Sequence, residues 1–156
     1  MRWSHYIVQL GVLMSLVAMS EVKALAGPFA PAAGQSGSTA IINTSPQFVE
    51  WASGVQTFAR GPLDIANPGG GLASFGAAAE ALGFAEGNSS HITSLGDGGQ
   101  ITLTFDQPIA DGPGFDLAVF ENSFSDTFLE LAFVEVSTNG SDFVRFPAVS
   151  LTQSTT

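Results

Sequence analysis

The chain contains no cysteine among its 156 residues. Disulfides, thiolate chemistry and cysteine-based zinc or iron–sulfur sites are therefore excluded, so the fold must rest on an apolar core, alone or with a bound metal. Charge is scarce as well: charged residues make up 12% of the chain, about half the usual share. Basic residues are the scarcest, with four Lys and Arg against fourteen Asp and Glu. Polyanions are repelled by such a chain, so nucleic acid is excluded as a partner.

Glycine and phenylalanine are abundant, with 18 and 13 residues. Many glycines and aromatic residues with few long charged side chains favour strands and tight turns over long helices. The length suits one domain with its own core. The composition therefore predicts a single β-rich domain.

The first 26 residues have the three parts of a secretory signal. Arg2 and His5 open the chain, an apolar run covers residues 6–19, and a small-x-small site ends at Ala26. A membrane anchor is the alternative, but the run is shorter than the roughly 20 residues that span a bilayer. We predict cleavage after Ala26, a chain that is secreted or held at the cell surface, and no membrane span after cleavage.

Loss of this leader removes Arg2, Lys23 and Glu21, which leaves two basic residues (four minus two) and thirteen acidic ones (fourteen minus one). In the mature chain, residues 27–44 are rich in Gly, Pro, Ala and Ser and predict an extended lead-in. Residues 45–156 form the predicted domain. It opens with two short helices, over residues 45–54 and over residues 72–82. Four strands follow, over residues 101–105, 117–120, 129–137 and 143–146.

Asn139-Gly140 between the last two strands predicts a type I′ hairpin turn. Short strands separated by Gly- and Asp-rich turns are typical of an antiparallel β-sandwich. The sequence therefore predicts an all-β fold of this kind.

Three segments carry a resemblance to a known family: SLGDGGQITLTF continuing to residue 122, FLELAFVEVS at 128–137, and residues 139–147. They resemble bacterial cell-surface proteins of the PEP-CTERM sorting type, many of which end in a Pro-Glu-Pro signal and a membrane-spanning tail. Residues 134–143 are also similar to the hairpin of discoidin-type, galactose-binding-like jelly rolls. The resemblance implies a jelly-roll sandwich with further strands and a sorting tail, so we expect residues 45–156 to be the front part of a truncated domain.

Four oxygen-bearing side chains lie beside the Gly-Pro-Gly turn at 112–114: Asp111, Asp116, Glu121 and Asn122. Hard oxygen ligands of this kind suit Ca²⁺. The alternative is that the aspartates cap the turn and Glu121 is solvated. Calcium is therefore a candidate cofactor with these four residues as its ligands.

Strand alternation places one glutamate on either face of the strand over residues 129–137, Glu130 on one and Glu135 on the other. A carboxylate on an apolar face needs a partner. We expect that partner to be Arg145 on the next strand, with Ca²⁺ as the alternative.

Aromatic residues offer a binding surface for sugars, whose apolar faces stack on rings. Trp51, Phe124 and Phe128 are candidates, and Phe124 is the preferred ligand-binding residue because it lies in a polar loop. The alternative is that these rings belong to the core. Extracellular polysaccharide or a cell-envelope component is the expected partner.

The sequence predicts no enzyme. His91, the one histidine after the leader, stands in a polar loop without a Ser/His/Asp grouping. Our first hypothesis is an exported, non-catalytic binding or display module of the cell surface or extracellular matrix. The alternatives are a carbohydrate-binding module and a glycoside-processing enzyme with Glu121 and Glu130 as paired carboxylates.

Overall fold

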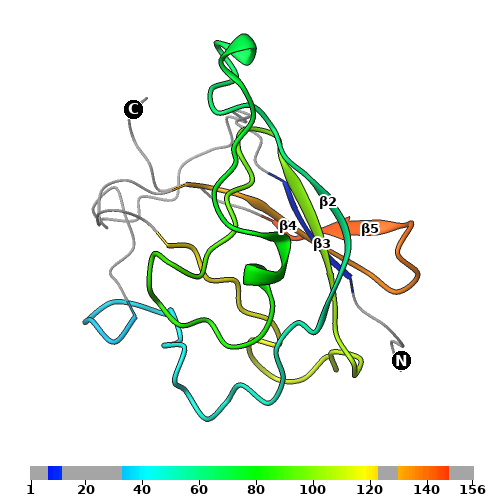
Figure 1. Ribbon diagram of the computed structural model, residues 1–156. Coiled ribbons are helices and arrows are strands. Elements are labelled where there is room, and N and C mark those ends of the chain that lie inside the picture. Colours follow the sequence, from blue (N-terminus) through cyan, green and yellow to red (C-terminus); the bar gives the residue numbers. More distant parts are fainter. Residues whose placement is uncertain (1–6, 12–32, 123–129, 148–156) are drawn as a thin grey trace, which may run out of the picture.

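The computed structural model describes residues 7–11, 33–122 and 130–147. The strands of these residues form one antiparallel sheet in the order β2-β3-β1-β4-β5 (Figure 1). They are β1 (Ile7–Gly11), β2 (Gly54–Ala59), β3 (Gln100–Thr104), β4 (Phe133–Ser137) and β5 (Phe143–Arg145). Helix is limited, within the same residues, to two single 3-10 turns, η1 (Pro68–Gly70) and η2 (Ala78–Ala81). The prediction of a β-rich antiparallel fold is confirmed.

β3 forms where alternating apolar and polar residues predicted a strand over residues 101–105. Ile101 and Thr102 are 3% and 4% exposed, and because successive strand residues point to opposite faces, both faces of the sheet are covered here. The Oγ1 atoms of Thr57 and Thr102 lie 2.8 Å apart in a hydrogen bond, which gives the buried Thr102 hydroxyl a partner. The β2–β3 ladder shifts register between Val55 and Thr57, as at a β-bulge.

β4 and β5 form the hairpin that the sequence predicted, but its turn differs. The strands pair up to Ser137 and Phe143, so five residues connect them instead of the two of a type I′ turn. Side chains organise this loop: Ser137 Oγ accepts the N–H of Gly140 at 2.9 Å, and Asn139 Oδ1 accepts the N–H of Asp142 at 2.9 Å. These local bonds compete with continued strand pairing, which explains the longer loop.

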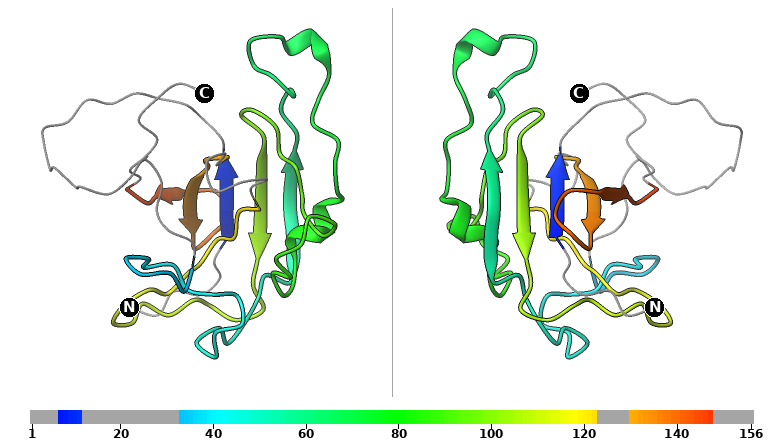
Figure 2. Two further views of the ribbon diagram at one scale, coloured as in Figure 1. Left: turned by 90° about the vertical axis from the view of Figure 1, so that its left-hand side faces the viewer. Right: turned by 90° about the vertical axis from the view of Figure 1, so that its right-hand side faces the viewer.

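β1 lies within the predicted leader and occupies the centre of the sheet, between β3 and β4 (Figure 2). It runs antiparallel to both neighbours, with Gln9 opposite Thr102 on one side and Glu135 on the other. The leader and the domain boundaries at residues 26 and 44 stay predictions. Within the sheet, β3 and β4 do not pair with each other, because β1 lies between them.

The predicted helix over residues 45–54 is wrong. This segment has turns and extended backbone, and β2 begins at Gly54. The Ser45 hydroxyl accepts the N–H of Gln47 at 3.3 Å within a local turn. Helices this short depend on tertiary contacts, and here the pairing of Gly54–Ala59 with β3 stabilises extended backbone instead.

The predicted helix over residues 72–82 shortens to the single turn of η2. Gly76 has φ of +70°, which no helix accommodates, and the next residues run back alongside residues 92–94. The N–H of Ser94 donates to the carbonyl of Phe75 at 3.1 Å. The left-handed backbone at Gly76 therefore interrupts the predicted helix, and only the single turn of η2 forms after it.

The predicted strand over residues 117–120 is also wrong, since the described backbone there is irregular. Val119 and Phe120 are 43% and 39% exposed. The Phe120 ring packs against the rings of Phe48 and Trp51 instead of lying in a sheet. Ring packing between loops replaces strand pairing in this segment.

Long loops surround a small core. The buried apolar side chains among the described residues are those of Ala52, Ala73, Leu95 and Ile101. Loop residues 60–99 fold back on themselves: the N–H of Gly61 donates to the carbonyl of Leu95 at 2.8 Å, and the N–H of Asp97 donates to the carbonyl of Pro62 at 2.9 Å. Within the described residues no helix has the length and apolar character needed to cross a bilayer.

Candidate functional site

Four rings from three separate loops form an aromatic cluster, which we define as Phe48, Trp51, Phe84 and Phe120. Their centroids lie 5.2 to 5.7 Å apart in four pairwise contacts. Phe84 is 48% exposed and Phe120 is 39% exposed, whereas Phe48 and Trp51 are half-buried. Aromatic rings with this mixture of packing and exposure suit contact with a partner.

Backbone hydrogen bonds hold the loops of the aromatic cluster in place. The N–H of Gly83 donates to the carbonyl of Ala52 at 2.9 Å, which brings Phe84 beside Trp51. On the other side, Glu50 Oε1 accepts the backbone N–H groups of Asp106 and Gln107 at 2.9 and 3.1 Å. The cluster therefore sits on loops tied to the ends of β2 and β3.

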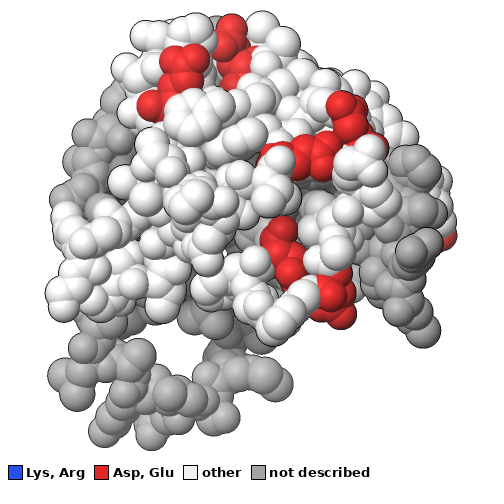
Figure 3. Space-filling model, turned by 90° about the horizontal axis from the view of Figure 1, so that it is seen from below, with Lys and Arg blue, Asp and Glu red and all other residues white. Residues whose placement is uncertain are grey.

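The molecule is acidic on the side seen in Figure 3, where separate groups of Asp and Glu are visible and no Lys or Arg. Both basic residues that follow the leader have partners elsewhere. Arg60 donates to the carbonyl of Gly76, and its guanidinium lies 5.0 Å from the centroid of the Phe58 ring. Arg145 pairs with Glu135. Most of the acidic surface is therefore left without a basic neighbour.

The four predicted metal ligands lie in one loop region without forming a cluster. Asp116 Oδ1 accepts the N–H of Gly112 at 3.0 Å, which is the capping role given as the alternative. Glu121 Oε1 accepts the N–H of Glu130 at 3.4 Å. Asp111 is exposed and Asn122 is half-buried. Among the described residues, no three His, Cys, Asp or Glu side chains converge on a point where they could hold a metal ion.

The predicted pairing of Glu135 with Arg145 is confirmed. Arg145 Nε lies 2.7 Å from Glu135 Oε1, across the β4–β5 ladder. The Glu135 side chain is 17% exposed, and the Arg145 guanidinium lies 4.1 Å from the centroid of the Phe133 ring. Arg145 thus supplies the positive charge that the half-buried Glu135 carboxylate needs, while its guanidinium also contacts the Phe133 ring.

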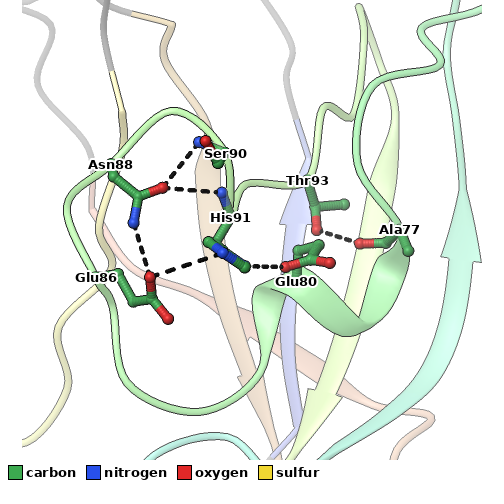
Figure 4. Close-up of polar contacts among 7 residues, drawn as sticks. All are labelled: Ala77, Glu80, Glu86, Asn88, Ser90, His91 and Thr93. Carbon is green, nitrogen blue, oxygen red and sulfur yellow. Dashed lines mark hydrogen bonds and ion pairs between the residues drawn. The ribbon is translucent and has the colours of Figure 1, made fainter.

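His91 lies between two carboxylates (Figure 4). Its Nδ1 is 2.9 Å from Glu80 Oε2 and its Nε2 is 3.9 Å from Glu86 Oε2. The hydrogen bond to Glu80, followed by the charges of Glu86 and Glu80, raises the pKa of His91 above its ordinary value. Asn88 supports the arrangement, since it donates to Glu86 at 2.7 Å and accepts the N–H of His91 at 3.2 Å.

Comparisons with protein-family models, curated proteins and solved structures found no match. The resemblance to PEP-CTERM cell-surface proteins therefore stays a prediction carried by its motifs. The structure itself offers the aromatic cluster as the candidate site for function.

The sequence prediction found part of the aromatic cluster. Trp51 was a candidate, and the Phe48 ring packs against it from the same loop. Phe124 and Phe128 lie outside the described residues. Phe84 and Phe120 were missed, because they lie 33 and 69 positions after Trp51 in the sequence, and no local pattern reports a contact between distant loops.

Proposed function

We propose that this chain is an exported, non-catalytic binding or display module of the bacterial cell surface or extracellular matrix. The leader pattern and the resemblance of residues 94–147 support the location. The antiparallel sheet is compatible with the jelly-roll sandwich that the resemblance implies, which remains part of the proposal. The observation that carries the binding role is the half-exposed aromatic cluster on loops at the ends of β2 and β3.

Exposed apolar side chains outside the aromatic cluster also support a binding role. Among the described residues, Val49 is 96% exposed and Phe115 is 75% exposed, and both lie in loops near the aromatic cluster in sequence. Large exposed apolar side chains in loops are typical of surfaces that meet a partner. A cell-envelope component would supply that partner.

A carbohydrate-binding module is the second candidate. Phe84 and Phe120 expose ring surface, and acidic residues follow them in the chain at Glu86 and Glu121. Aromatic rings and carboxylates together suit the apolar faces and hydroxyls of a sugar. The rings are tilted at 37° to 72° to one another, which is a packed cluster and not one flat stacking platform, so this candidate ranks second.

A glycoside-processing enzyme ranks third. Glu121 and Glu130 are neighbours, but both are exposed. The general acid of a glycosidase works in an apolar setting that keeps it protonated. His91 bonds to Glu80 and Asn88 within a surface loop, which suits a structural role.

The test is binding of the purified full chain to a cell-envelope fraction and to a glycan array. We expect the wild-type chain to bind the cell-envelope fraction. Phe84→Ser and Phe120→Ser should each weaken this binding about tenfold, an effect of roughly 1.4 kcal/mol. Phe146→Ser is the matched control: Phe146 is 46% exposed, close to the 48% of Phe84, and it follows β5, outside the three loops of the aromatic cluster, so this variant should bind like the wild type.

The outcomes separate the candidates. Envelope binding that survives periodate treatment supports the first candidate, and periodate-sensitive binding with glycan-array signals supports the second. Absence of binding to both, or equal losses in all three variants, would overturn the assignment of the aromatic cluster.

A further inference from the structure

Both arginines among the described residues lie against an aromatic ring. The Arg145 guanidinium is 4.1 Å from the centroid of the Phe133 ring, and the Arg60 guanidinium is 5.0 Å from that of Phe58. At Arg145 a carboxylate completes the set, because Glu135 Oε1 lies 2.7 Å from Arg145 Nε. A ring face and a carboxylate both attract a guanidinium, which is planar, charged and rich in donors. This protein therefore contains one complete set of ring, carboxylate and guanidinium.

The aromatic cluster presents the ring part of the same set at the surface. The centroid of the Trp51 ring is 5.3 Å from that of Phe84 and 5.7 Å from that of Phe120. Phe84 and Phe120 are 48% and 39% exposed, and their planes are tilted by 72° and 37° to that of Trp51. A cation needs only one ring face within about 6 Å. The tilt that disfavours the stacking of a flat sugar is therefore compatible with a cation.

Carboxylates lie on the loops that carry these rings. Glu50 comes directly before Trp51 in the sequence, and its Oε1 accepts the backbone N–H of Asp106 at 2.9 Å. Asp106 Oδ1 in turn accepts a hydrogen bond from the Ser53 hydroxyl at 2.6 Å. Because the donors to both carboxylates are neutral, these bonds do not offset the negative charge.

No basic residue of the described chain lies at the aromatic cluster. Arg60 and Arg145 are the Lys and Arg residues of the described part, and both have partners elsewhere. The cluster loops, residues 43–53, 83–90 and 105–122, contain six acidic residues (one, one and four) and no Lys or Arg. The first and third of these loops run together below the sheet (Figures 1 and 2), and Figure 3, seen from that side, shows Asp and Glu but no Lys or Arg. A cation from a partner would therefore meet rings and carboxylates without competition from these residues.

We propose that the aromatic cluster binds an arginine-bearing, basic segment of a partner protein. This step rests on the binding role proposed above and names the chemistry of the partner. A guanidinium lies over the exposed ring of Phe84 or Phe120 and donates to the carboxylate of Glu50 or Asp106. Arginine is preferred to lysine because its planar group stacks on a ring while its N–H groups bond to a carboxylate. The negative charge of the cluster loops attracts a basic segment and repels an acidic one.

The test measures the fluorescence anisotropy of a labelled peptide of alternating Ser and Arg with the purified full chain. Peptides of the same length that carry Lys or Gln in place of Arg are compared with it. We expect the Lys peptide to bind about threefold more weakly and the Gln peptide at least tenfold more weakly, since Gln carries no charge. Equal binding of the Arg and Lys peptides would show that charge alone is recognised and would overturn the assignment to arginine.

Two conservative variants test the two halves of the site. Phe120→Leu keeps an apolar side chain but removes the ring, and Asp106→Asn keeps Oδ1 as an acceptor but removes the charge. Each should weaken binding of the Arg peptide about threefold to fivefold. Phe146→Leu and Asp64→Asn are the matched controls, because Phe146 is 46% exposed after β5 and Asp64 is exposed in the loop that follows β2. Both should bind the Arg peptide like the wild type.

Each further outcome supports or contradicts a named part of the proposal. Full binding by Phe120→Leu would contradict the ring contact, and equal losses in Asp106→Asn and Asp64→Asn would leave only general charge attraction. Binding of phosphatidylcholine vesicles in place of the Arg peptide would assign the cluster to a lipid headgroup and overturn the proposal. A chain that binds the envelope fraction but not the Arg peptide would contradict the partner chemistry alone. A chain that binds the Arg peptide but not the envelope fraction would support that chemistry and contradict the proposed location.

Discussion

Two charged pairs among the described residues differ in how far they are buried. Glu135 is 17% exposed and meets Arg145 Nε at 2.7 Å, whereas His91 and Glu80 are 53% and 34% exposed. Solvent and salt screen an exposed pair strongly and a half-buried pair less. The Glu135–Arg145 pair should therefore contribute to stability at any ordinary salt concentration, and the His91 group only where histidine is protonated.

Replacing Glu135 by Gln should lower the free energy of unfolding by about 1 kcal/mol, the upper part of the range for pairs of this kind. The charge-assisted bond to Arg145 is lost while the side-chain volume is kept. Urea denaturation measures the effect, and a double-mutant cycle with Arg145→Ala isolates the pair. Glu130→Gln is the control, because that side chain is exposed; a loss as large there, or a coupling of zero in the cycle, would contradict the pairing.

The His91 group should make stability depend on pH near neutrality. Its pKa is raised from 6.5, first by the hydrogen bond to Glu80, so the folded state binds the proton more tightly than the unfolded state does. The stabilisation is therefore fully present below pH 6.5 and is lost as the pH rises through the raised pKa. We expect the melting temperature of the wild type to exceed that of His91→Gln at about pH 6 and the two to converge at about pH 8.

Glu80→Gln tests the cause of this pKa shift. An NMR titration of the His91 imidazole should show its pKa falling toward 6.5 in this variant. Glu86→Gln should lower it less, since Glu86 lies 3.9 Å from the ring nitrogen against 2.9 Å for Glu80. An unchanged titration in Glu80→Gln would show that the contact does not form in solution.

At the scale of elements, a tight loop crossing positions the chain where it enters β3. Residues 60–62 cross residues 95–99 so closely that glycine is required at the crossing. A Cβ on Gly96 would lie 2.5 Å from the carbonyl oxygen of Gly61 and 2.8 Å from Cβ of Ala73. Real side chains do not approach backbone oxygens this closely, so this crossing fixes the path of the chain into β3.

Gly96→Ala should therefore destabilise the protein by about 2 kcal/mol or more, from the left-handed backbone together with the clash. Gly83→Ala is a matched control, because Gly83 has nearly the same φ, +74° against +72°, with open space around its Cβ position. We expect it to cost only the backbone part, about 1 kcal/mol. Thermal or urea melts give both values, and equal losses would mean that the crossing is looser than described.

At the scale of the whole molecule, unbalanced charge is the dominant feature. The mature chain would carry thirteen acidic and two basic residues after loss of Arg2, Lys23 and Glu21, and both basic residues already have partners. Self-repulsion of this size lowers the stability of a compact state. A divalent cation that binds the folded chain would offset it.

Calcium is therefore expected to raise the melting temperature, and EDTA to reverse the rise. Sodium chloride at equal ionic strength separates binding from screening, since screening acts alike for both salts. An equal response to both salts would end the calcium proposal.

Local patterns in the sequence determined the parts of this protein that depend on neighbouring residues. Alternation along 101–105 was enough for β3, because side-chain direction along a strand is set by neighbouring residues. Asn139-Gly140 was enough to place the β4–β5 hairpin but not its turn type, since five residues connect the strands. The partner of Glu135 followed from the same alternation. The helices predicted at 45–54 and 72–82 failed because short segments take the conformation that their long-range contacts stabilise.

Only the tertiary structure decided which distant residues meet. It brought Phe84 and Phe120 to Trp51 across more than thirty residues of chain, and it placed Ile7–Gly11 between β3 and β4. A strand's pattern shows which of its faces is apolar but not which edges it joins, since every backbone carries the same hydrogen-bonding groups. The aromatic cluster and the central position of β1 depend on such long-range pairings, so residue order alone could not reveal them.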